Sequence, residues 1–315
     1  EIDQIDMLLA KIMYDIKNKQ NFAKSDSSLT NLIEQKIKET KQNKLLINSS
    51  RFKLRLFKMY SRILLQNQDF ENLEEFLLNS LSEFKKNKFF ERSNHDEKLT
   101  LLTYLVNCLY ENKKYNSSLK YAKELKSSMK EYDGFLEEKY LFYYYNALVL
   151  NYGKTDKNKS LETLNEASKN EIIKKIPAYT SFIYLNTAVL YFQMKKYSLA
   201  QKNISRLILQ HDFVNLDTVF QFQIFVFELV LRIELNQKDI LNEKITLLKK
   251  DFKKLIKSDQ FSRESSLIDL ISEFCKGKDI EKLLNSFIDK YSNISNDRNT
   301  IIDYLSWAKN YFKSA

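Results

Sequence analysis

Glycine and proline are nearly absent from this sequence, which holds three glycines and one proline, Pro177, in 315 residues. Tight hairpin turns and strand ends depend on these two residue types, so a fold rich in β-strands is excluded. Leucine, lysine, glutamate, phenylalanine and asparagine fill the intervals instead. This composition predicts a chain that is almost entirely helical.

Cysteine and histidine are equally scarce, which argues against metal and disulfide chemistry. Cys108 and Cys275 lie far apart, and neither has a second cysteine or a histidine at ligand spacing. His95 and His211 have no neighbouring group recognisable as a catalytic partner. The glycines are too dispersed for a phosphate-binding loop. We therefore predict a protein that is not an enzyme and that uses no metal and no cofactor.

Long apolar runs are also missing. The most apolar stretch, residues 219–235, is interrupted by polar side chains, namely Gln221, Gln223, Glu228, Arg232 and Glu234. It therefore predicts a buried helix and not a membrane span. No secretory signal is visible, so we predict a cytoplasmic protein. The first residue is Glu1 and not methionine, and the sequence does not tell whether a domain precedes it.

Charged residues are abundant and mixed in sign. The chain carries 51 Lys and Arg against 41 Asp and Glu, which gives a formal net charge of +10. Most of the surplus is lysine interspersed with glutamate, so two interpretations stay open: an ordinary solvated surface, or a surface for an acidic partner. With 43% apolar residues, the chain has enough apolar surface to fold.

A short pattern of packing residues recurs along the chain. Tyr197, Ala200 and Ile204 follow a polar turn and serve as the reference. The same offsets give Phe70, Leu73 and Leu77; Tyr115, Ser118 and Ala122; Lys157, Ser160 and Leu164; Ile240, Glu243 and Leu247; and Ile280, Leu283 and Phe287. The middle residues recur about every 40 to 45 positions. Because residues three and four apart share a helix face, each occurrence predicts a helix with one packing face.

The helix before each turn keeps the same register. Small or apolar residues stand twelve positions before the middle residues, at Ser61, Val106, Leu148, Ala188, Leu231 and Ile271. A hairpin of two such helices cannot bury both apolar faces alone, whereas stacked hairpins can. The sequence therefore predicts an all-α solenoid of antiparallel helix pairs, with about six to seven hairpins.

No stretch has the composition of a linker, so we predict one continuous domain over residues 1–315. Six repeat units would occupy residues 51–290, between an irregular N-terminal hairpin in residues 1–50 and a C-terminal capping helix in residues 291–315. The last helix would span residues 300–312, with Trp307 sealing the final hydrophobic layer.

One unit resembles a tetratricopeptide repeat (TPR). Tyr184–Leu207 carries a small residue in the first helix, Ala188, an aromatic near its end, Tyr191, and a small residue in the second helix, Ala200. The period is longer than the roughly 34 residues of such repeats, and the closing proline is absent. The resemblance implies a right-handed superhelix whose first helices line a concave groove for an extended peptide or a helix. It also implies a role as a scaffold, an adaptor or a peptide-sensing regulator.

The candidate groove residues lie on the predicted first helices. They are Arg55, Lys58 and Arg62; Thr103, Tyr104 and Asn107; Tyr145 and Asn146; Asn186 and Phe192; and Glu228 and Arg232. An asparagine amide donates and accepts at once, so it can pair with both backbone groups of an extended peptide. Tyrosine and phenylalanine would add apolar contact, and the cations would hold a carboxylate. Asparagine and lysine are common throughout, so an ordinary solvated face remains the competing interpretation.

Three functions follow from these expectations. The first is a non-catalytic scaffold or adaptor that binds a protein or peptide partner in the groove. The second is binding of nucleic acid or an anionic surface through a Lys-rich segment, comprising Lys244, Lys249, Lys250, Lys253, Lys254 and Lys257. The third is the ligand-sensing half of a peptide-responsive regulator whose output domain precedes Glu1.

Overall fold

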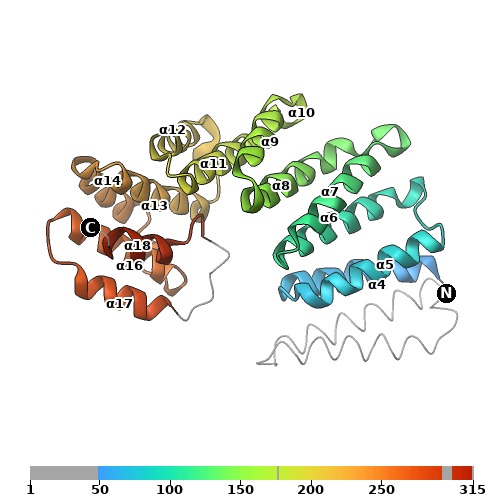
Figure 1. Ribbon diagram of the computed structural model, residues 1–315, viewed down its shortest axis with the longest axis horizontal. Helices are drawn as coiled ribbons and strands as arrows, with labels where there is room; N and C mark the ends of the chain where they lie inside the picture. Colours follow the sequence, from blue (N-terminus) through green and yellow to red (C-terminus); the bar gives the residue numbers. More distant parts are fainter. Residues whose placement is uncertain (1–48, 176, 293–299, 314–315) are drawn as a thin grey trace. The chain divides into compact units, whose positions relative to one another are not determined.

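The computed structural model describes residues 49–175, 177–292 and 300–313, and every element within these ranges is helical. The predicted all-α class is therefore confirmed (Figure 1). The chain divides into two compact units, Glu1–Asp156 and Lys157–Ala315. The predicted N-terminal hairpin, residues 1–50, lies almost entirely outside the described residues.

Unit 1 is a stack of long helices joined by short turns. Its described helices are α4 (Ser50–Gln66), α5 (Phe70–Lys86), α6 (His95–Glu111), α7 (Tyr115–Met129) and α8 (Glu137–Thr155), with short 3-10 turns η1 (Arg92–Asn94) and η2 (Glu131–Gly134). Successive helices pack against each other, and α6 also packs against α8. The first helices of the predicted hairpins are thus α4, α6 and α8.

Unit 2 continues the same pattern with extra short helices. The long helices are α9 (Lys157–Lys169), α11 (Pro177–Gln193), α12 (Tyr197–Ile208), α13 (Thr218–Glu234), α14 (Lys238–Asp251), α16 (Ser262–Cys275), α17 (Glu281–Tyr291) and α18 (Tyr304–Lys313). The short helices are α10 (Glu171–Lys174), η3 (His211–Asn215), α15 (Lys253–Ile256) and η4 (Asp259–Phe261). The two helices of the third predicted hairpin, α8 and α9, belong to different units.

Most turns between paired helices place a residue other than glycine in the left-handed region. Five first helices are followed by a residue with positive φ: Gln68 (55°), Lys113 (60°), Lys195 (58°), Asn236 (54°) and Gly277 (71°). A left-handed residue after a helix lets the chain reverse and satisfies the last carbonyl groups. The scarcity of glycine therefore does not prevent tight helix hairpins, although a side chain in this region costs energy.

The predicted packing positions of the first helices are confirmed, because all of them are buried, namely Ser61, Val106, Leu148, Ala188, Leu231 and Ile271. The middle positions of the first four units are buried as well, namely Leu73, Ser118, Ser160 and Ala200. Small side chains let paired helices approach, and the hydroxyl of Ser118 donates to the carbonyl of Val106 at 2.8 Å.

The predicted register is wrong in the last two units. Glu243 is exposed and Leu283 is 43% exposed, whereas Leu241 and Leu284 are buried. In both helices the buried residue is the fourth of the helix, as it is in α5, α7, α9 and α12. Because Leu283 and Leu284 are adjacent apolar residues, the apolar pattern alone does not tell which of them faces the core.

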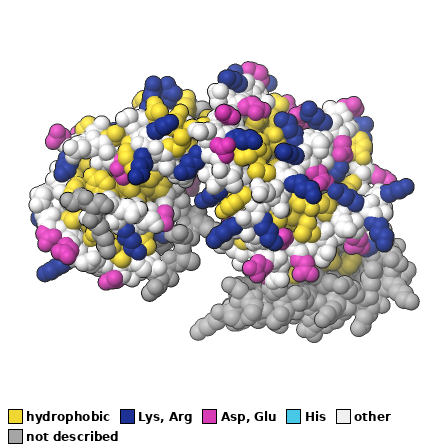
Figure 2. Space-filling model, in the orientation of Figure 1, with side chains coloured by type: hydrophobic (Ala, Val, Ile, Leu, Met, Phe, Trp, Pro, Cys, Tyr) yellow, Lys and Arg dark blue, Asp and Glu magenta, His cyan; other side chains and the backbone are white. Residues whose placement is uncertain are grey.

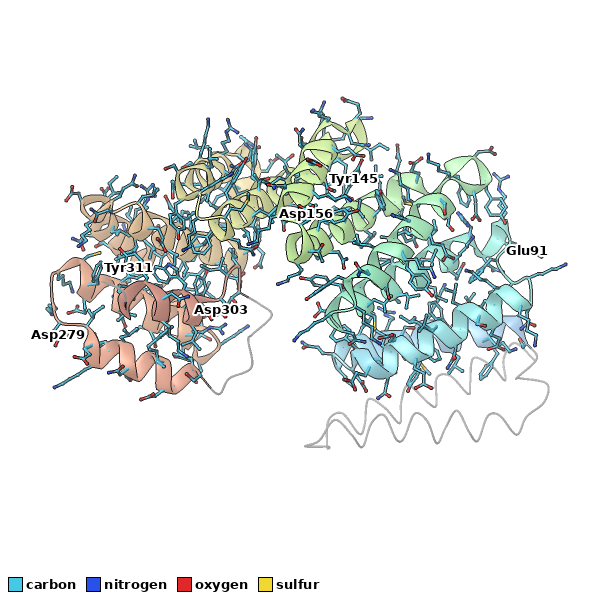
Figure 3. All side chains as sticks on the ribbon, viewed as in Figure 1. Glu91, Tyr145, Asp156, Asp279, Asp303 and Tyr311 are labelled. Atoms are coloured by element: carbon cyan, nitrogen blue, oxygen red, sulfur yellow. The ribbon has the colours of Figure 1, made fainter. Side chains whose placement is uncertain are left out.

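The C-terminal helix seals the core of unit 2, as predicted, but begins later than residue 300. Asp303 accepts a hydrogen bond from the backbone N–H of Ser306 at 2.9 Å and so caps α18 (Figure 3). Trp307 is buried, and its indole N–H donates to Glu234 Oε1 at 2.7 Å.

The most apolar stretch of the sequence forms α13. Its side chains from Val226 to Leu231 are all buried in unit 2. Among the described residues, no helix combines the length and apolar character needed to cross a membrane.

Candidate partner-binding surfaces

The first helices of unit 1 form one contiguous surface, because polar contacts join them in sequence. Lys58 on α4 pairs with Glu97 on α6 at 2.7 Å. The hydroxyl of Tyr140 on α8 lies 2.7 Å from the hydroxyl of Thr100 and donates to Asp96 Oδ1 at 2.9 Å, both on α6. We call the exposed and half-buried side chains along α4, α6 and α8 the first-helix face, comprising Arg55, Lys58, Arg62, Thr100, Thr103, Tyr104, Asn107, Tyr143 and Asn146.

The side-chain amides of two asparagines on this face make no hydrogen bond within the described residues. Asn107 is exposed and Asn146 is half-buried, and neither side chain has a partner within the described ranges. By contrast, the amide of Asn151, on the packed side of α8, donates to Ser118 Oγ at 2.9 Å and to the carbonyl of Ala147 at 2.8 Å. Asn107 and Asn146 are therefore able to hydrogen-bond a ligand without losing an internal bond.

The charges on the face are partly neutralised. Lys58 is held by Glu97, and Lys139 is held by Asp96 at 2.5 Å. Burial alone would raise the pKa of the Asp96 carboxyl, but hydrogen bonds from Lys139 and Tyr140 outweigh it and lower the pKa. Arg62 is exposed and has no ion pair within the described part of the chain. Arg62 is thus the cation most available to a carboxylate.

The aromatic residues do not all lie where the sequence predicts. Tyr145, which Figure 3 labels on α8, is only 4% exposed, and its ring lies 5.3 Å from that of Tyr144, which is also buried. Tyr104 is half-buried, with its ring 6.5 Å from that of Phe57. The exposed aromatic of α8 is Tyr143, at 46%. Tyr145 is the residue predicted for the groove, whereas the accessible ring on α8 belongs to Tyr143.

The other predicted groove residues lie in unit 2 and serve internal packing. Asn186 donates its amide to the carbonyl of Phe182 at 2.8 Å. Phe192 packs edge-on against Phe227, with ring centroids 5.4 Å apart. Glu228 is 2% exposed and pairs with Arg232 at 2.7 Å. These residues have little freedom to contact a partner.

A second concave surface, absent from the sequence prediction, lies in unit 2. Helix α11 forms its floor, and α9 and α12, which both pack on α11, form its walls. This α11 groove has a volume of about 570 Å³. On the walls, Leu164 of α9 and Asn203 of α12 are buried, whereas Leu199 of α12 is 43% exposed.

The Lys-rich segment on α14 and α15 is not a free row of cations. Lys244 pairs with Glu228 at 2.8 Å, and Lys249 pairs with Asp269 at 2.7 Å. On the face shown in Figure 2, basic and acidic side chains are interspersed. Within the described ranges, no cluster of His, Cys, Asp and Glu could hold a metal ion.

The fold defines a class of protein: an all-α helical-repeat solenoid built from antiparallel helix pairs. Among solved structures, the chain is similar to the crystal structure of the apo form of RapI, with a TM-score of 0.65 and 13% sequence identity. The match covers 92% of this chain and 86% of the RapI chain. No family model matches this sequence, and no curated protein matches it significantly. At this identity the likeness shows the fold alone.

Proposed function

We propose that this protein is a non-catalytic interaction module that binds an extended segment of a protein partner along the first-helix face of unit 1. The observation that supports this most is the pair of side-chain amides of Asn107 and Asn146, which have no partner within the described residues and lie on packed first helices, α6 and α8; the exposed Tyr143 stands one turn before Asn146. Helical-repeat folds present such first-helix surfaces to partners.

The chemistry of the face suits an extended chain. Each amide can accept from a backbone N–H and donate to a backbone C=O, so two of them fix the direction of a peptide without reading its side chains. Tyr143 offers a broad apolar surface with low conformational freedom to lose on binding. Arg62 would add a charge-assisted hydrogen bond to a carboxylate of the segment. Together these groups favour an extended segment with an acidic residue near the α4 end.

The Lys-rich segment supports the nucleic-acid alternative less well. Two of its six lysines are held in ion pairs, one of them with a buried carboxylate. The regulator alternative is a special case of the same binding face, in which the segment is a signalling peptide.

The test uses a displayed library of short random peptides selected against the whole protein. Peptides that bind are then measured against an Asn107→Ala, Asn146→Ala double variant, which should weaken binding by about 10- to 100-fold because each lost hydrogen bond to a buried backbone group costs about 1 kcal/mol or more. Asn79→Ala is the matched control, because Asn79 is an exposed asparagine on α5. Equal binding by the double variant and the control would remove the first-helix face from the proposal.

A further inference from the structure

The α11 groove is lined by helical side chains on its floor and on both walls, with Ile173 and Lys174 of α10 at one end. Along α11 the lining residues Thr180, Ile183, Thr187 and Tyr191 recur at spacings of three and four, so they share one helix face. The same spacing holds for Leu161 and Leu164 on α9 and for Leu199 and Lys202 on α12. At 1.5 Å per residue, the α11 floor is about 16 Å long, which corresponds to about three helical turns.

The charge of the groove has one sign. Its cations are Lys174, Lys202 and Arg206, and no acidic residue lines it within the described ranges. Lys174 pairs with Glu171 at 2.7 Å, beside the groove. Lys202 and Arg206 are exposed, lie one turn apart on α12, and have no ion pair among the described residues. The cations without an ion pair therefore lie on one wall of the groove, the one formed by α12.

The opposite wall is polar but neutral. Helix α9 contributes Asn165 and Ser168 to the groove, and the hydroxyl of Ser168 donates to the carbonyl of Asn165 at 2.8 Å. The groove thus has a mixed floor, in which Ile183, Tyr184 and Tyr191 alternate with two threonines, a cationic edge on α12 and a neutral edge on α9.

We propose that the α11 groove is a second docking surface, for an amphipathic helix of a partner protein whose acidic residues follow one edge of its apolar stripe. The charge complementarity between that acidic edge and Lys202 and Arg206 selects this occupant. This surface lies in unit 2 and does not depend on the first-helix face.

A helix fits the groove better than an extended chain because of its backbone. An extended segment brings unpaired N–H and C=O groups that need partners when they are buried. Polar side chains line the α9 wall and the floor, but on the α12 wall the amide of Asn203 already donates to the carbonyl of Leu199 at 2.8 Å, so an extended chain would find neutral partners on one side only. A helix satisfies its own backbone, and its side chains at i, i+3, i+4 and i+7 match the spacing of the floor and walls.

The experiment uses a displayed library of amphipathic helices with a fixed apolar stripe and randomised positions on both flanks. We expect selection to enrich Asp and Glu on one flank only, because only the α12 wall carries free cations. A synthetic helix from this selection should bind at least about tenfold more tightly than the same helix with its acidic residues changed to lysine, since the change replaces two exposed ion pairs with two repulsive contacts.

Charge reversal makes the test specific for this groove. The Lys202→Glu, Arg206→Glu variant should no longer bind the acidic synthetic helix and should bind the lysine version instead. A control variant, Lys123→Glu, Lys130→Glu, makes the same charge change on exposed residues in and just after α7 and should leave both affinities unchanged.

Four results would overturn the proposal: no enrichment of acids, enrichment on both flanks, equal effects of the two double variants, or equal binding by a proline-containing version that cannot form a helix. Duplex DNA is the competitor that tests the nucleic-acid alternative. If it displaces the synthetic helix and its own binding is lost in the Lys202→Glu, Arg206→Glu variant, the groove is a nucleic-acid site and not a docking site for a helix.

Discussion

The amide of Asn151 donates to the hydroxyl of Ser118 at 2.9 Å, and both side chains are fully buried. Ser118 in turn donates to the carbonyl of Val106. One chain of hydrogen bonds therefore crosses three successive helices, α8, α7 and α6. It fixes the register of neighbouring hairpins, which apolar contacts alone specify less sharply because they have no direction.

Removing this link should destabilise unit 1 far more than removing an exposed amide. Asn151→Ala leaves the Ser118 hydroxyl without its donor and opens a small cavity, so we expect a loss of about 2 kcal/mol in the free energy of unfolding. Asn79→Ala should change it by less than about 0.5 kcal/mol. Urea unfolding followed by circular dichroism measures both. If the two variants unfold at the same urea concentration, the hydrogen-bond chain has no role in stability.

The helix pairs are predictable from the sequence because their apolar residues recur at helical spacing. Which polar side chains form internal hydrogen bonds, and which stay available to a partner, is not predictable in this way. Asn151, Asn186 and Asn203 all donate to a carbonyl four residues earlier, at Ala147, Phe182 and Leu199. Asn146 and Asn107 make no such bond, and nothing in the sequence separates these two groups. The α11 groove was not predicted for a related reason: its lining comes from four helices, α9 to α12, and depends on how they are arranged in space.

The left-handed turns give a second prediction. Lys113 is exposed and has a φ of 60°, a region in which a side chain costs about 1 kcal/mol or more relative to glycine. Lys113→Gly should therefore raise the free energy of unfolding by about 0.5 to 1 kcal/mol. The same change within α7, Lys123→Gly, should lower it by about 1 kcal/mol because glycine is a poor helix former. Thermal melting of the two variants should shift in opposite directions, and a shared direction would contradict the role assigned to the turn.

His95 gives a prediction about pH. It is 1% exposed at the start of α6, with its ring 5.0 Å from that of Tyr132 and Glu131 Oε2 at 3.9 Å from Nδ1. Burial lowers the pKa of His95, and nearby Lys98 acts in the same direction, whereas Glu131 and Asp96 oppose it. Below an ordinary histidine pKa of about 6.5, the unfolded chain therefore binds more protons than the folded one, and stability falls as the pH falls.

The measurement is the urea midpoint at several pH values from about 7 to about 5. His95→Phe should flatten the decline over the interval between the ordinary histidine pKa and the lower pKa of the folded state, since the variant has no group to protonate there. His211→Gln is the control, because His211 is exposed and should keep the wild-type slope. An unchanged slope in His95→Phe would assign the acid sensitivity to other groups.

Glu228 gives the largest expected effect on stability. It lies on α13 and is 2% exposed, and it accepts hydrogen bonds from Arg232 Nε at 3.0 Å and from Lys244 Nζ at 2.9 Å. Glu228→Ala would leave the guanidinium of Arg232, whose side chain is 13% exposed, without its counter-ion. We expect a loss of about 3 kcal/mol or more in the free energy of unfolding, whereas Lys244→Ala should cost less than about 1 kcal/mol because Lys244 is partly solvated.

A double variant separates the cost of a stranded charge from the value of the ion pair itself. In Glu228→Leu, Arg232→Leu both charges are gone and apolar side chains fill part of their space, so this variant should be more stable than Glu228→Ala. Chemical unfolding of the three variants gives the ranking directly. A double variant as unstable as Glu228→Ala would mean that Glu228 is also needed for its ion pair with Lys244, which joins α13 to α14, and not only for neutralising Arg232.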